Sequence, residues 1–152
     1  MPPLPTTWQA NTPADLSRIA LELLAAAAPA RLFTLEGSMG VGKTTFVGAI
    51  AQALGATDTP SSPTYTLVNE YSTADAATTI LHLDLYRLKD LDEALNIGIE
   101  DILDTPNPYI FVEWAGIIAP LLPEEVANIS IVANADDSRT ITLRIGAFVA
   151  FA

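Results

Sequence analysis

The 152-residue sequence contains no cysteine, and it has only 7 lysine and arginine residues against 18 aspartate and glutamate residues, a formal net charge of -11. The absence of cysteine excludes disulfide frameworks, thiolate metal sites and cysteine nucleophiles. The shortage of cations disfavours a protein that binds DNA or RNA on its own, because nucleic-acid phosphates repel an acidic surface. No stretch approaches the roughly 20 apolar residues that span a bilayer, and the N-terminus lacks a secretory signal pattern. We therefore expect a cytoplasmic protein that contacts neither membrane nor DNA.

The composition nevertheless predicts a folded chain. Half of the residues are hydrophobic, which is enough to bury a core, and the length is close to the commonest size of a single domain. Residues 1–11 contain three prolines and show no periodicity. We expect a flexible N-terminal arm at residues 1–11 and a single domain over residues 12–152.

The first half of the chain has the pattern of a helix, a strand, a glycine-rich turn and a second helix. Apolar residues recur at helical spacing between Thr12 and Pro29, while residues 31–35 form a short apolar run typical of a buried strand. Residues 44–54 again have helical spacing, and Gly55 stands where a C-terminal cap is expected. The order is that of a strand that feeds a loop and then a helix.

The second half alternates strand and helix patterns. The predicted elements are strands at 66–71 and 79–86, an acidic helix at 90–103, an apolar strand at 109–114, and two strands at 128–135 and 138–145 joined by an Asp-Asp turn. This pattern predicts an α/β fold with a mostly parallel sheet and antiparallel edge strands, the last two forming a C-terminal hairpin.

Residues 37–44, with the sequence GSMGVGKT, match the phosphate-binding pattern G-x-x-x-x-G-K-[ST] at every fixed position. Glycines let the backbone wrap closely around a phosphate chain, and the loop and the helix N-terminus aim N–H donors at it. Lys43 is expected at the β- and γ-phosphates, and the Thr44 hydroxyl at Mg²⁺. A plain glycine turn would not explain a lysine that begins an otherwise apolar helix. The pattern predicts a three-layer P-loop NTPase-like fold.

Two carboxylates are candidates for the acid that such a site needs at the end of a neighbouring strand. Asp84 lies near the end of an alternating strand, and Glu113 ends an apolar run, where an uncompensated carboxylate is costly. The alternatives are an ordinary solvated carboxylate or, for Asp84, an ion pair with Arg87. The sequence does not divide the roles between the two acids.

Four further features have two interpretations each. His82 shares a strand face with Asp84, and it is equally consistent with a catalytic base and with a half-buried imidazole bonded to a neighbour. The segment 61–66 is either a polar loop or a switch that senses the γ-phosphate. Trp114 is expected to pack at the end of the sheet, with base stacking as the lesser alternative. Arg139 is expected to be a surface arginine, although it could reach a phosphate or a partner.

Four segments together carry a resemblance to a known family. GSMGVGKTTF, SSPTYTLVNEY, HLDLYRL and VEWAG, in this order, resemble the TsaE family of bacterial P-loop ATPases in tRNA threonylcarbamoyladenosine synthesis. The similarity spans roughly residues 12–145. Many families share the phosphate loop, whereas SPTYTLV, H-x-DLYR and VEW together are specific to TsaE. One departure is Ala115-Gly116 after the EW pair, where the family usually has proline and often an acid, so the contacts of that loop are open.

The resemblance implies an enzyme, a Mg²⁺-dependent ATP hydrolase that works with the proteins TsaB and TsaD. Its ATP turnover would reset that complex between rounds, and the tRNA would be handled only indirectly, through the partners. The implied catalytic residues are Lys43, Asp84 and Glu113, and the implied Mg²⁺ ligands are Thr44 and Glu113. The implied ATP-binding residues are Gly37, Ser38, Met39, Gly40, Val41, Gly42, Lys43, Thr44, Thr45 and, in the switch-like SPT segment, Thr64.

Two other functions fit a phosphate loop. A small-molecule P-loop kinase would transfer phosphate to an acceptor, and a nucleotide switch would bind without turnover. Kinases of this type usually enlist several cations, whereas Arg87 and Lys89 are the only basic residues between Lys43 and Arg139. The same shortage leads us to expect low ATPase activity in the absence of partners.

Overall fold

The computed structural model describes residues 4–57, 67–74, 78–105 and 108–149. The strands are β1 (Thr6–Ala10), β2 (Leu32–Glu36), β3 (Val68–Tyr71), β4 (Thr79–Asp84), β5 (Pro108–Glu113), β6 (Val126–Ala133) and β7 (Arg139–Gly146). The helices are α1 (Asp15–Ala27), α2 (Lys43–Ala53), α3 (Leu91–Asn96) and α4 (Ile99–Leu103), with a 3₁₀ segment, η1 (Ala115–Leu121). In this described part of the chain, no helix is long and apolar enough to cross a membrane.

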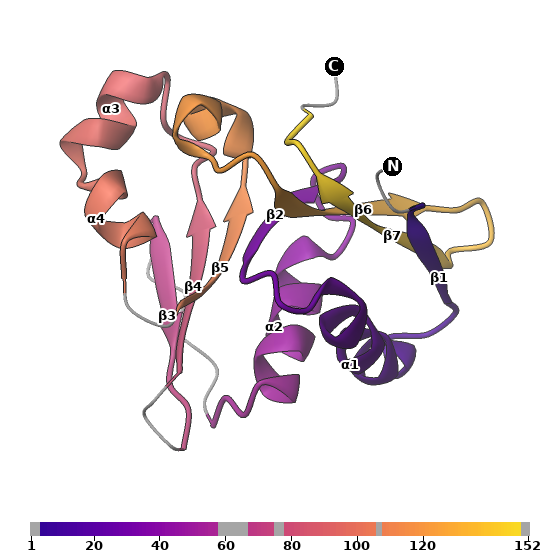
Figure 1. Ribbon diagram of the computed structural model, residues 1–152. Helices are drawn as coiled ribbons and strands as arrows, with labels where there is room; N and C mark the ends of the chain where they lie inside the picture. The colour runs from indigo at the N-terminus through magenta and orange to yellow at the C-terminus, as the bar shows by residue number, and fades with distance from the viewer. Residues whose placement is uncertain (1–3, 58–66, 75–77, 106–107, 150–152) are drawn as a thin grey trace.

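The described strands form one seven-stranded sheet in the order β1-β7-β6-β2-β5-β4-β3. The four middle strands, β6, β2, β5 and β4, are parallel to one another. At one edge β3 pairs antiparallel with β4, and at the other edge β7 and β1 add two antiparallel pairings (Figure 1). The predicted α/β class, the parallel middle of the sheet and the C-terminal hairpin are confirmed.

The two faces of the sheet pack into two separate apolar cores. One core joins α1 and α2 to the sheet and takes Ile80 from β4. The other joins α3, α4 and η1 to the opposite face and takes Leu81, Leu83 and Leu85. The alternation predicted for residues 79–86 is therefore confirmed, since neighbouring residues of this strand face opposite cores. Figure 1 shows α1 and α2 side by side, apart from α3 and α4.

The structure corrects the prediction of an N-terminal arm. The sequence predicts an arm over residues 1–11, but Thr6–Ala10 form β1, which pairs antiparallel with β7 from Thr6↔Leu143 to Ala10↔Arg139. Trp8 packs against the first core and Ala10 is buried in it. The three prolines precede the strand, so they leave its ladder intact, and β1 covers an edge of β7 that would otherwise be open.

The prediction of a single helix at 90–103 is wrong, because the structure has two short helices there. Asp90 caps α3 by accepting a hydrogen bond from the amide of Glu93 at 3.0 Å, as a helix start at this position requires. Gly98 lies between the helices with φ of 83°, a left-handed conformation that stops the helical path. The polypeptide therefore changes direction within the acidic segment.

The start of α1 depends on Asp15. Its Oδ2 accepts hydrogen bonds from the amides of Thr12 at 3.0 Å and Asn11 at 2.8 Å. These backbone donors, Thr12 first, lower the pKa of Asp15 below its ordinary value, because they stabilise the ionised carboxylate. The helix itself begins at Asp15. At the end of α2, the predicted glycine is confirmed, since Gly55 follows the C-cap residue Leu54 with φ of 99°.

Candidate functional site

The glycine-rich loop lies between β2 and α2, as predicted, and its path depends on backbone space. A Cβ at Gly37 would lie 2.7 Å from the carbonyl oxygen of Ile131 and 2.8 Å from Cγ1 of Val41. Gly42, with φ of 113°, adopts a left-handed conformation directly before the first residue of α2. A side chain at either glycine would oppose this path, so the local sequence dictates a tight loop at a helix N-terminus.

Lys43 turns back across the loop. Its Nζ donates a hydrogen bond to the carbonyl oxygen of Gly37 at 2.7 Å and lies 3.7 Å from Oε1 of Glu113. Only about a tenth of the lysine side chain is exposed. The ammonium group therefore joins the start of the loop to the end of β5.

The sheet places both candidate acids beside the loop. Leu35 of β2 pairs with Glu113 of β5, and Glu113 in turn pairs with Asp84 of β4. Because these strands are parallel, their carboxyl ends meet at one edge of the sheet, next to the loop that follows β2. A cavity of about 340 Å³ opens there, lined by Met39, Gly40, Gly42, Lys43, Thr44, Thr45, Asp84, Tyr86, Glu113 and Trp114. Most of the residues implied by the resemblance are thus brought together in one cavity.

The remaining residues of the loop have other surroundings. Gly37 and Ser38 line a neighbouring cavity of about 650 Å³, between the loop, β6 and η1. Val41 is buried in the first core. Thr64, and with it Ser61, Ser62 and Thr66, lies outside the described residues, so the switch prediction has no structural test.

His82 and Glu113 form a buried pair. His82 Nε2 lies 2.6 Å from Glu113 Oε2, and both residues are about 95% buried or more. When the carboxylate is ionised it can only accept, so Nε2 carries the proton of this hydrogen bond. Among the described residues, His82 Nδ1 has no hydrogen-bond partner. Of the two interpretations of His82, the structure has the imidazole bonded to a neighbour, buried more deeply than expected.

Asp84 and Trp114 are exposed at the mouth of the smaller cavity. Asp84 Oδ1 accepts a hydrogen bond from the amide of Tyr86 at 3.1 Å, which fixes the carboxylate at the end of its strand. Trp114 is 51% exposed, and its ring lies 5.7 Å from that of Tyr86. The expectation that Trp114 packs at the end of the sheet is wrong in part, because its backbone turns into a left-handed conformation, with φ of 61°, directly after β5.

Arg139 is a further correction, since it is not an isolated surface arginine. Its Nε donates a hydrogen bond at 2.9 Å to the carbonyl oxygen of Val41, which belongs to the glycine-rich loop. The two residues are 98 positions apart in the sequence. Only the adjacency of β6 and β2 brings them together, and no local pattern carries that information.

The donors in the cavity are chemically suited to Mg²⁺. They are hard oxygens, namely the hydroxyl of Thr44 and the carboxylates of Asp84 and Glu113. In the described part of the chain, no group of three or more histidines and acids could hold a metal ion by itself. Mg²⁺ commonly uses one or two protein carboxylates and completes its six ligands with phosphate oxygens and water. The donor set fits that mode and not an all-protein cage.

Comparison with known proteins agrees with the sequence motifs and this arrangement. The family model described as threonylcarbamoyl adenosine biosynthesis protein TsaE matches residues 10–141. A TsaE protein of Bacillus subtilis is 37% identical over 135 residues, which are 89% of this chain and 82% of that protein. A TsaE protein of Rickettsia bellii is 33% identical over 130 residues, 85% of this chain and 88% of that protein. The crystal structure of YdiB from Bacillus subtilis matches with a TM-score of 0.72 and 31% identity, over 95% of this chain and 87% of that one. The chain belongs to the TsaE family of threonylcarbamoyl adenosine biosynthesis proteins.

Proposed function

We propose that this protein is a Mg²⁺-dependent ATP hydrolase in tRNA threonylcarbamoyladenosine biosynthesis. Membership of the TsaE family supports the biosynthetic role. The observation that carries the enzymatic part is one cavity that holds the lysine and threonine of a phosphate loop together with carboxylates from two adjacent strand ends. Positioning and charge neutralisation supply most of the catalysis in phosphoryl transfer, and this cavity has the groups for both.

The loop and Lys43 bind the triphosphate in this proposal. Backbone N–H groups at the start of α2 have no partner within the helix, and they carry the positive end of its dipole. Lys43 already lines the cavity, and its ammonium lies between Gly37 and Glu113. ATP binding would exchange this internal contact for contacts with the phosphates.

Thr44 and Glu113 would hold Mg²⁺, which supplies neutralisation of the phosphate charge. His82 acts behind Glu113, because its hydrogen bond to Oε2 orients the carboxylate from the buried side. Oε1, which faces Lys43, is the oxygen directed to the cavity side of this pair. In the described residues, Glu113 is thus held by two groups that fix its direction.

Asp84 orients the attacking water in this proposal. It lines the cavity and is exposed, whereas Glu113, its partner on the adjacent strand, is buried, so Asp84 is the better placed of the two to face solvent. The hydrogen bond from the amide of Tyr86 holds one carboxylate oxygen. This division gives Glu113 to the metal and Asp84 to the water.

The hydrolysis would reset the TsaB–TsaD complex between rounds, in the cytoplasm. A strongly acidic protein is suited to docking on a complementary protein surface and poorly suited to direct tRNA binding. The tRNA would therefore be handled by the partners.

The test is steady-state ATP hydrolysis with and without TsaB and TsaD, for the parent chain and three variants. We expect Lys43→Ala to lose at least about tenfold in kcat/KM, because a charge-assisted contact with phosphate is removed. Asp84→Ala should lose about 100-fold or more in kcat, and Glu113→Ala should raise the Mg²⁺ concentration required. Arg18→Ala, on the exposed face of α1, is the control and should match the parent.

Three results would contradict the proposal. Hydrolysis in Asp84→Ala at the parental rate would remove the catalytic role of this residue. Transfer of the γ-phosphate to a small acceptor in place of water would favour a kinase. Nucleotide binding without turnover, even with both partners present, would favour a switch.

A further inference from the structure

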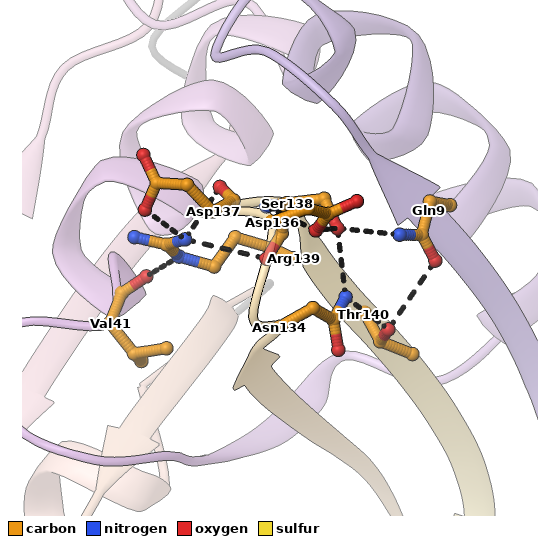
Figure 2. Close-up of polar contacts among 8 residues, drawn as sticks. All are labelled: Gln9, Val41, Asn134, Asp136, Asp137, Ser138, Arg139 and Thr140. Carbon is orange, nitrogen blue, oxygen red and sulfur yellow. Dashed lines mark hydrogen bonds and ion pairs between the residues drawn. The ribbon is translucent and has the colours of Figure 1, made fainter.

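Arg139 is held between the glycine-rich loop and the β6–β7 hairpin (Figure 2). On the loop side, its Nε donates to the carbonyl oxygen of Val41 at 2.9 Å. On the hairpin side, its Nη1 donates to the carbonyl oxygen of Asp137 at 2.8 Å and lies 3.2 Å from the Asp137 carboxylate. The planar guanidinium therefore contacts both segments at once, as its several donors in one plane allow.

The turn of the hairpin presents fixed acceptors to this guanidinium. The amide of Asn134 donates to the carbonyl oxygen of Ser138 at 2.8 Å, and the amide of Asp137 donates to that of Asn134 at 3.0 Å. Asp137 has φ of 69°, a conformation that aspartate tolerates better than most residues. Backbone hydrogen bonds thus close the turn without a contribution from Arg139.

Hydrogen bonds around the buried Ser138 tie the same turn to β1. The Ser138 hydroxyl accepts hydrogen bonds from Gln9 Nε2 at 2.7 Å and from Asn134 Nδ2 at 3.0 Å. It donates a hydrogen bond to Asp136 Oδ1 at 2.5 Å (Figure 2). The hydroxyl and amide of Ser138 lower the pKa of Asp136, since both donate to its carboxylate. Ser138 is almost fully buried. The guanidinium therefore rests on a turn that the edge of the sheet holds in place.

The contact with Val41 has a direct consequence for the loop. Val41 lies between Gly40 and Gly42, whose φ values of 80° and 113° leave this stretch with the freedom of glycine. In a trans peptide the C=O and the following N–H point in opposite directions. Because Arg139 holds the carbonyl of Val41 on the side of the β6–β7 hairpin, the amide N–H of Gly42 is directed away from that hairpin. Gly42 lines the smaller cavity.

We propose that Arg139 is a positioning residue that fixes the Val41–Gly42 peptide so that its N–H faces bound phosphate. The inference rests on the proposed function, because it assigns Arg139 to the same nucleotide site. A charged donor on the carbonyl also polarises the peptide and strengthens its N–H as a donor. Arg139 acts through the backbone of the loop and does not itself touch the nucleotide.

The first test is amide hydrogen exchange in the nucleotide-free protein, for the parent chain, Arg139→Ala, Arg139→Lys and Arg18→Ala. The last variant removes the same charge from an exposed site on α1 and is the matched control. We expect faster exchange in residues 38–44 of Arg139→Ala, with exchange in α1 unchanged. Arg139→Lys should be intermediate, since one ammonium cannot contact both Val41 and Asp137 in the geometry of the guanidinium. Equal exchange of the loop in Arg139→Ala and the parent would overturn the proposal.

The second test is calorimetric titration of the same four proteins with ADP and ATP in the presence of Mg²⁺. Loss of one charge-assisted hydrogen bond that orders the site should weaken binding by about tenfold in Arg139→Ala, while Arg18→Ala binds like the parent. Parental affinity in an Arg139→Ala protein that retains the parental thermal midpoint would overturn the proposal. If the parent itself binds no nucleotide, the proposed function fails, and the exchange experiment still decides whether Arg139 fixes the loop.

Discussion

Glu113 has a partner at each of its carboxylate oxygens. Its two oxygens lie 2.6 Å from His82 Nε2 and 3.7 Å from Lys43 Nζ, and the residue is 5% exposed. A carboxylate at such depth is costly unless donors or cations surround it. Removal of the histidine donor would leave the carboxylate less compensated and free to rotate. The chemistry of Glu113 is therefore inseparable from His82.

Substitution of His82 tests this dependence. His82→Leu should lower kcat or the apparent Mg²⁺ affinity by about 10- to 100-fold, the usual effect of removing a group that orients a metal ligand. His82→Gln, whose amide can still donate to Glu113, should retain more of both. The measurements are kcat and the Mg²⁺ concentration for half-maximal rate in folded protein. Equal activity in His82→Leu and the parent would contradict an orienting role.

Gly37 gives a prediction about stability at the same scale. Gly37→Ala should destabilise the fold by about 1–3 kcal/mol, since its Cβ would meet the backbone oxygen of Ile131. Gly48 is the matched control, because it lies inside α2 and an added Cβ would meet nothing within 4 Å beyond its chain neighbours and the backbone of its own helix. Gly48→Ala should stabilise the protein by about 0.5–1 kcal/mol. Urea unfolding measures both, and equal shifts in the same direction would refute the account of the loop.

At the scale of elements, helix starts and turns depend on carboxylates that accept hydrogen bonds from backbone amides. Asp15 does so at the start of α1, Asp90 at the start of α3, and Asp136 in the β6–β7 turn. Each is the residue type that satisfies amides left without partners at such positions. The excess of acids in the composition thus has local structural uses in addition to its effect on net charge.

The lowered pKa of Asp15 predicts that the stability of the protein depends on pH in the acid range. Its pKa is lowered in the folded state, so its contribution is present above the unfolded value, near pH 4, and is lost as the pH falls through the folded value. Asp15→Ala should therefore be less stable than the parent at pH 7, and the difference should shrink below about pH 4. Thermal unfolding from pH 7 to pH 3 measures it. A difference that is constant over this range would contradict the assigned cause.

At the scale of the whole molecule, the strand order brings the site together. The order β6-β2-β5-β4 puts the loop after β2 beside the ends of β5 and β4, so residues from three parts of the chain share one cavity. The rule that ligands bind at the carboxyl ends of parallel strands covers this arrangement. The sequence could accordingly predict four residues of this cavity, because each belongs to a motif or to the end of a strand: Lys43, Thr44, Asp84 and Glu113.

The contacts that sequence reasoning missed depend on tertiary structure. The His82–Glu113 bond needs the register of β4 on β5, and the Arg139–Val41 bond needs the adjacency of β6 and β2. The strand at Thr6–Ala10 was not predicted, because the prolines before it favour an irregular segment. The strand forms by pairing with β7, whose residues lie more than 120 positions away in the sequence. Local patterns predicted most of the elements but not β1, and the pairing of the strands determined the contacts within the site.

Calorimetric titration of ATP with Mg²⁺ into the parent chain and Lys43→Ala tests the central claim most directly. The account predicts saturable binding with one site per chain in the parent, and binding at least about tenfold weaker in Lys43→Ala. Absence of binding to the folded parent, or equal affinity in the two proteins, would contradict the assignment of the glycine-rich loop as a nucleotide site.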